Sequence, residues 1–86
     1  MVYLAIEPSG ALEAIELAKT NGAVVWLGSD AITHEEHWSL GAQGVELTRF
    51  AYPLSGASAA TIAESISTVV QHHPEETLWV QYTERP

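Results

Sequence analysis

Several polar residues that could perform chemistry stand where apolar segments of this 86-residue chain end. Glu7 and Asp30 each follow an apolar run, and two carboxylates held close together could bind a divalent cation or transfer a proton. The small residues of segment 55–58 precede an amphipathic stretch, where free backbone amides could receive an anion. The predicted ligand-binding residues are Glu7, Ser9, Gly10, Asp30, Ser55, Gly56 and Ser58. The alternative interpretation is structural, because acids and serines also stabilise helix N-termini.

The segment from Asp30 to His37 has the spacing most typical of metal ligands in this chain. His34 and His37 fall about 60° apart on a helix, and Asp30 precedes the first turn. The predicted metal ligands are therefore Asp30, His34 and His37, and a nearby glutamate would complete the set. Trp38 shares the helix face of His34, so the alternative is that the imidazole rings cover Trp38 or rest on the surface.

No complete catalytic or cofactor motif is present in the sequence. The chain lacks cysteine, which excludes disulfides, iron–sulfur clusters, thiol catalysis and Cys-based zinc sites. It also lacks the GxxxxGK[ST] and GxGxxG phosphate-binding motifs and the GxSxG nucleophile motif. We therefore assign no catalytic residue. The sequence requires no cofactor, although a divalent metal fits the acidic and histidine residues named above.

Apolar runs and amphipathic stretches alternate along the chain and must position these residues. Strands are expected at residues 2–6, 23–27, 45–52 and 77–82, and helices at residues 11–20, 34–42 and 57–71. Pro8 ends the first strand, and Ser9 is expected to cap the first helix. Thr33 and Glu36 have the spacing of a capping box, which predicts that the second helix begins at His34.

The alternation predicts a single α/β domain over residues 1–86, a small three-layer Rossmann-like or flavodoxin-like fold with a four-stranded, mostly parallel sheet. The strands at 2–6 and 23–27 are apolar on both faces and should be central, which favours strand order 3-2-1-4. Order 2-1-3-4 and an antiparallel fourth strand are the alternatives. The carboxyl ends of parallel strands share one rim, where ligands bind near the point at which strand order reverses, so we expect the candidate residues there.

Two acidic positions resemble those of a known fold. Glu7 at the end of the first expected strand and Asp30 after the second resemble the toprim fold of topoisomerases and primases. That fold also carries an Asp-x-Asp pair after its third strand, where this chain has Tyr52, Pro53 and Leu54. We therefore assign no family from the sequence and transfer no functional residue.

The charge balance restricts the partners of this chain. Eleven acidic residues face three basic ones, so the formal net charge is −8. Lys19, Arg49 and Arg85 are far apart in sequence, whereas nucleic acids and anionic membranes attract clustered cations. We therefore expect no nucleic-acid partner and no membrane partner. The sequence also shows no signal-peptide pattern and no apolar run near the roughly 20 residues that span a bilayer, which predicts a cytoplasmic protein.

Because no catalytic motif is present, the favoured function is a non-catalytic protein-interaction or self-associating module, such as a homodimer, that acts through an edge strand and an acidic face. Trp26 is expected in the core. Trp79 lies on the more polar face of an outer strand, where it is either an exposed anchor for a partner or covered by the 57–71 helix. The alternative function is a ligand-, nucleotide- or metal-binding domain, or a hydrolase, with its site at the strand carboxyl ends.

Overall fold

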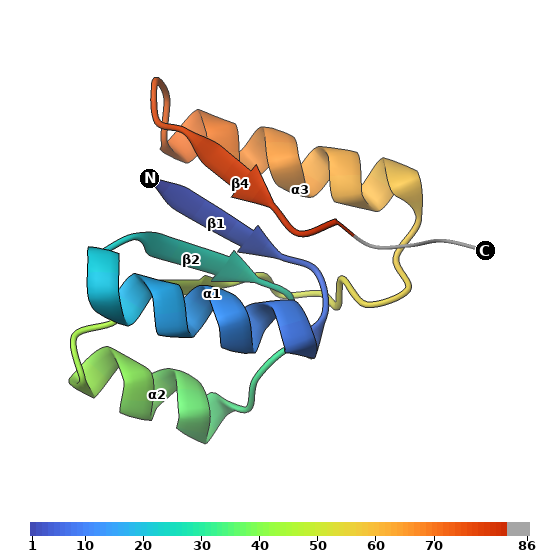
Figure 1. The fold of residues 1–86 in the computed structure, drawn as a ribbon. Coiled ribbons are helices and arrows are strands. Elements are labelled where there is room, and N and C mark those ends of the chain that lie inside the picture. Colours follow the sequence, from blue (N-terminus) through green and yellow to red (C-terminus); the bar gives the residue numbers. More distant parts are fainter. Residues whose placement is uncertain (83–86) are drawn as a thin grey trace.

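Four strands and three helices alternate along the chain in the computed structural model, which describes residues 1–82 (Figure 1). In chain order they are β1 (Val2–Ala5), α1 (Pro8–Asn21), β2 (Val24–Leu27), α2 (His34–Ala42), β3 (Leu47–Arg49), α3 (Ala59–His72) and β4 (Leu78–Val80). The elements have the type and order that the sequence predicts. Residues 83–86, which include Arg85, lie outside the described range.

The sheet is parallel throughout, with strand order β3-β2-β1-β4. β1 aligns Val2 with Val24 of β2 and with Leu78 of β4. β2 aligns Val25 with Leu47 of β3. These registers confirm the predicted α/β fold and the favoured order, and they exclude order 2-1-3-4 and an antiparallel fourth strand. The apolar strands β1 and β2 are central because both of their faces are covered.

Helices cover both faces of the sheet and form the two outer layers (Figure 1). On the face of α1 and α2, Val25 and Leu27 of the sheet cluster with Ile15 of α1. On the face of α3, Trp26 clusters with Val69. Trp26 is 6% exposed, which confirms its predicted place in the core.

The starts of the first two helices follow local capping chemistry. α1 begins at Pro8 with Glu7 as its N-cap, so the predicted Ser9 cap is wrong. The fixed φ of proline suits the first helical position, and Ser9 therefore lies inside the first turn. α2 begins as predicted with a complete capping box. The Glu36 amide donates to Thr33 Oγ1 at 3.0 Å, and the Thr33 amide donates to Glu36 Oε1 at 2.9 Å.

The third strand is shorter than the predicted 45–52 segment. β3 spans Leu47–Arg49, and the amide of Phe50 still donates to the carbonyl of Leu27 at 2.9 Å. The chain then leaves the sheet, and the carbonyl of Tyr52 accepts a hydrogen bond from the amide of Ser29 at 3.0 Å. Pro53 follows directly and has no amide proton for a strand ladder, which explains why the pairing ends here.

α3 begins two residues later than predicted because Ser58 caps it. The amide of Thr61 donates to Ser58 Oγ at 3.2 Å, so the helix starts at Ala59. None of the helices formed by residues 1–82 has the length and apolar character needed to cross a bilayer.

Candidate functional site

The parallel sheet places the predicted ligand-binding residues beyond the carboxyl ends of the strands. Glu7 directly follows β1, Asp30 lies in the connection after β2, and Ser55 lies in the connection after β3. Ser58 caps α3 there. The structure therefore gathers these residues at one rim, and their hydrogen bonds show how each is used.

Gln81 lies at the point where strand order reverses, between β1 and β4. Its side-chain Oε1 accepts hydrogen bonds from the amide of Ile6 at 2.7 Å and from the amide of Glu7 at 2.8 Å. Its Nε2 donates to Glu7 Oε1 at 3.5 Å. In open parallel sheets this crevice is the usual ligand position. Here the carboxamide of the chain itself binds two backbone amides at the entry to α1.

Gly10 is explained by the same carboxamide. A Cβ atom built on Gly10 would collide with the side chain of Gln81. Glycine is a poor helix former and costs up to about 1 kcal/mol relative to alanine in a helix interior, so its presence in α1 calls for a packing reason. That reason is the close approach of Gln81, and the sequence alone does not distinguish it from the close approach of a ligand.

A hydrogen bond to Asp30 links the connection after β3 to the segment that follows β2. Oδ1 of Asp30 accepts this hydrogen bond from the amide of Leu54 at 3.2 Å. A Cβ atom on Gly28 would lie 2.7 Å from the Leu54 nitrogen, so only glycine permits this approach. Leu54 is fully buried under α3 among the residues described. The hydrogen bond from its amide to Asp30 thus positions the buried Leu54.

The environment of Asp30 favours its charged form. Partial burial alone would raise the pKa of Asp30, but the Ser55 hydroxyl and the nearby backbone amides, including that of Leu54, lower it below its usual value. The Oγ of Ser55 is buried and has no partner within ordinary hydrogen-bond geometry among residues 1–82. The carboxylate is therefore an acceptor for the loop after β3.

The structure does not bring the predicted metal ligands together. His34 Nδ1 lies 2.9 Å from Arg49 Nη2, and because a guanidinium only donates, this nitrogen of His34 is the acceptor. Asp30 is bonded to the loop amide described above. No group of three or more His, Asp or Glu side chains within residues 1–82 is arranged to hold a metal ion. Metal binding through Asp30, His34 and His37 stays a prediction.

The outer surface of α2 carries an open hollow of about 750 Å³. It is lined by His34, Glu35, His37, Trp38, Gly41 and Ala42. Trp38 is 80% exposed, so the imidazole rings do not cover it, and α2 contributes no buried residue among those described. The hollow is a property of one short helix and brings in no side chain from another element.

The outer edge of β4 is open on the side of α1. Within residues 1–82, β4 has β1 as its one neighbour in the sheet (Figure 1). Trp79 aligns with Tyr3 and therefore lies on the α1 face, where it is 58% exposed; α3, on the other face, does not cover it. We call the hollow of about 480 Å³ between this strand and α1 the edge groove, and its walls include Tyr3, Gly10, Ala14, Leu17, Trp79 and Gln81.

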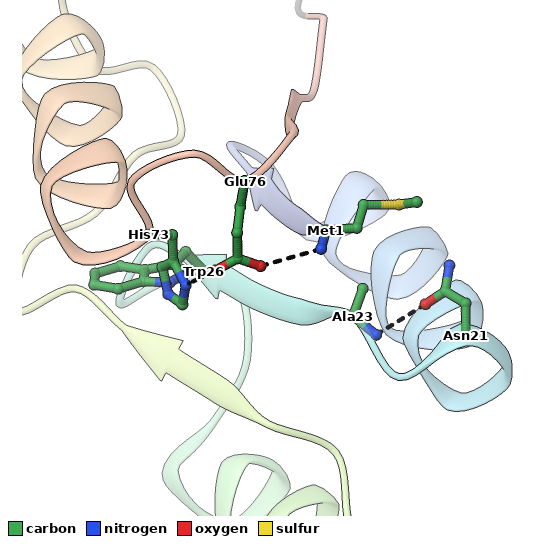
Figure 2. A network of polar contacts seen from close by, with 6 residues as sticks. All are labelled: Met1, Asn21, Ala23, Trp26, His73 and Glu76. Carbon is green, nitrogen blue, oxygen red and sulfur yellow. Dashed lines mark hydrogen bonds and ion pairs between the residues drawn. The ribbon is translucent and has the colours of Figure 1, made fainter.

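A polar network occupies the opposite pole, at the amino ends of the strands (Figure 2). The indole Nε1 of Trp26 donates to Nε2 of His73 at 3.1 Å, and Nδ1 of His73 lies 2.7 Å from Glu76 Oε2. Glu76 Oε1 also accepts a hydrogen bond from the amino group of Met1 at 3.1 Å. The hydrogen bond from His73 and the Met1 amino group together lower the pKa of Glu76.

The sequence prediction missed this network because its members are distant along the chain. The sequence does contain one signal, since a tryptophan in a buried strand carries an N–H that requires an acceptor. His73 follows α3 directly and supplies that acceptor across the sheet face. The network connects β2 to the turn before β4.

Comparison with protein-family models, curated proteins and solved structures found no match to this chain. At the rim, Gln81 and Asp30 use their polar groups to hold the fold together. At the edge of β4, Trp79 and the backbone beside it face outward.

Proposed function

We propose that this chain is a non-catalytic protein-interaction module that adds an extended segment of a partner protein to the free edge of β4. The observation that carries the proposal is Trp79, 58% exposed on an uncharged edge strand beside the edge groove. Addition of a strand to an exposed sheet edge is a common recognition mode, in which main-chain hydrogen bonds give affinity and side-chain pockets give specificity.

The backbone of β4 supports this proposal. The carbonyl of Thr77 accepts from Val2 at 3.0 Å, and the amide of Gln81 donates to Leu4 at 2.9 Å, so these residues face β1. Alternate residues of a strand turn their N–H and C=O groups to opposite sides. Leu78 and Val80 therefore direct theirs away from β1, and an incoming strand would satisfy these four groups.

The composition of β4 points the same way. Exposed edges are normally protected by charged residues, proline or bulges, which prevent pairing with other chains. Residues 77–82 contain no charged residue and no proline. Tryptophan is one of the residue types enriched at the hot spots of protein interfaces. The edge thus lacks protective charges and proline, and its three-residue length is what limits pairing with other chains.

The state of the rim gives less support to a ligand-binding function. An anion at the start of α1 would have to displace the carboxamide of Gln81 from two amides. A cation at Asp30 would compete with the amide of Leu54, whose side chain is buried in the core. Both groups stabilise the fold where they are, so a ligand would replace existing hydrogen bonds instead of filling free ones.

Selection of displayed ten-residue peptides against the immobilised protein tests the proposal. Selected peptides should shift the backbone amide resonances of Leu78 and Val80, and their binding should fall at least tenfold in Trp79→Ser. The matched control is Trp38→Ser, which removes the other exposed tryptophan and should leave binding unchanged. Peptides that bind equally to Trp79→Ser, or that shift the rim or α2 alone, would refute the proposal.

A further inference from the structure

We infer that the segment that pairs with β4 comes from a second copy of this chain, so that two sheets join edge to edge across a twofold axis. This inference rests on the proposed function above and identifies its partner. It follows from the register, the side-chain pattern and the charge distribution of β4, each of which fits an antiparallel pairing of β4 with itself.

The outward backbone groups fix the register of such a pair. Leu78 and Val80 turn their N–H and C=O groups away from β1, as described above. If Leu78 of one copy faces Val80 of the other, the N–H of each residue donates to the C=O of the residue opposite. The twofold axis repeats this arrangement for Val80 of the first copy and Leu78 of the second. Trp79 then lies on the twofold axis in the non-hydrogen-bonded position, where opposing side chains approach most closely.

The side chains match in this register. Trp79 faces Trp79 of the second copy on the α1 face, beside both edge grooves. On the other face, Val80, which is 39% exposed, faces Leu78 of the second copy. Thr77 faces Gln81, so uncharged polar residues flank the apolar centre. Aromatic and aliphatic cross-strand pairs of this kind stabilise a sheet by about 0.2–1 kcal/mol each in folded proteins.

The charges favour antiparallel over parallel pairing. The chain has a net charge of −8, so any contact between two copies must keep their carboxylates apart. In the antiparallel register the two copies of Glu76 lie at opposite ends of the paired strands, six residues or about 20 Å apart along the strand. A parallel pair, shifted by one residue so that the outward groups of the two strands can bond, would place the two Glu76 backbones about 6 Å apart at the same end. The antiparallel pair therefore keeps these two carboxylates apart.

The size of the interface sets the strength to expect. A strand of three residues and one tryptophan per copy is small compared with standard interfaces, which bury about 800 Å² per partner. We therefore expect a reversible, concentration-dependent dimer. Glu13 lies beside the edge groove, so salt should strengthen the association by screening like charges of the two copies.

Sedimentation equilibrium over a concentration series tests the inference. The expected result is a mass that rises from monomer to dimer, with amide resonances of Leu78 and Val80 shifting over the same range. Val80→Pro removes only the outward N–H and is tolerated on an edge strand, so it should stay monomeric with an unchanged circular dichroism spectrum. The matched control is Val80→Thr, which keeps the N–H and should still dimerise.

A charge exchange tests the position of the twofold axis. Trp79→Lys and Trp79→Glu should each be monomeric, because like charges would face each other across the pair. An equimolar mixture should recover dimer to at least tenfold above either variant alone. If the mixture stays monomeric while the wild type dimerises, the register centred on Trp79 is refuted.

Two outcomes separate this inference from the proposed function. If the wild type stays monomeric at millimolar concentration while selected peptides still occupy β4, the second copy is refuted and the interaction module stands. If the wild type stays monomeric and no peptide reaches β4, both are refuted. The wild-type measurements need no substitution, so they decide the inference even if a variant does not fold.

Discussion

The carboxamide oxygen of Gln81 accepts a hydrogen bond from the amide of Ile6 at 2.7 Å across 75 positions of sequence. The same oxygen accepts from Glu7 at 2.8 Å. One side chain thus joins the ends of β1 and β4 at the crevice where a parallel sheet usually binds its ligand. At the rim, side chains of the protein itself bond to the backbone amides. The exposed side chain of Trp79 lies elsewhere, at the edge strand β4.

Replacement of Gln81 by alanine should destabilise the fold. Gln81→Ala leaves the amide of Ile6, which is partly buried, without its acceptor, and such a loss costs about 1–3 kcal/mol. Urea unfolding followed by circular dichroism measures the change. The control is Gln71→Ala on the exposed surface of α3, which should change the free energy of unfolding by less than about 0.5 kcal/mol. Equal effects of the two substitutions would contradict this role of Gln81.

The effect of Gly10→Ala should depend on residue 81. In the wild type the added methyl group collides with Gln81 and should destabilise the protein. In the Gln81→Ala background the collision is gone, and alanine in the helix should stabilise by up to about 1 kcal/mol. A double-mutant cycle in urea measures this change of sign. Additive effects would show that the two residues do not interact.

The charge of Asp30 should contribute stability above about pH 4. Its pKa is lowered in the folded state, so the contribution is present above the unfolded-state pKa and disappears as pH falls through the folded-state value. Asp30→Asn keeps an acceptor for Leu54 but removes the charge. The difference in free energy of unfolding between wild type and Asp30→Asn should therefore be largest near pH 7 and shrink below pH 4. Glu64→Gln on the exposed face of α3 is the control, and a difference that is constant with pH would be inconsistent with this assignment.

The two adjacent histidines after α3 should differ in their contribution to stability. His73→Ala leaves the partly buried N–H of Trp26 without an acceptor, which costs about 1–3 kcal/mol. His72→Ala is the matched control, because its ring also packs near Trp26, with centroids 5.3 Å apart, yet its hydrogen bond goes to the exposed carbonyl of Thr68. Thermal unfolding should show a clearly larger loss for His73→Ala. Equal losses would mean that ring packing alone matters.

The architecture followed from local patterns in the sequence. The apolar runs of β1 and β2 predicted central parallel strands because they offer no polar face to solvent. The spacing of Thr33 and Glu36 predicted the start of α2 because a capping box is formed by residues three positions apart. Ser9 was misassigned as a cap because serine and proline both favour helix starts, and proline at the first helical position decided the boundary.

The use of the site residues depended on contacts that no local pattern encodes. Glu7, Asp30 and Ser55 reach one rim because the strands are parallel, which the alternation of elements predicted. Whether their polar groups are free depends on Gln81 and Leu54, which are distant in sequence from the residues they contact. The exposure of Trp79 followed equally from tertiary structure, because it depends on which face α3 covers.

The pairing of β1 with β4 also has a consequence for biosynthesis. β1 is translated long before its second neighbour, because Leu78, which aligns with Val2, follows it by more than seventy residues. Until then the nascent chain exposes one side of an apolar strand, and such delayed long-range contacts slow folding and invite aggregation. The emerging polypeptide therefore has to keep β1 unpaired on that side, shielded by its own collapse or by a chaperone, until synthesis has passed β4.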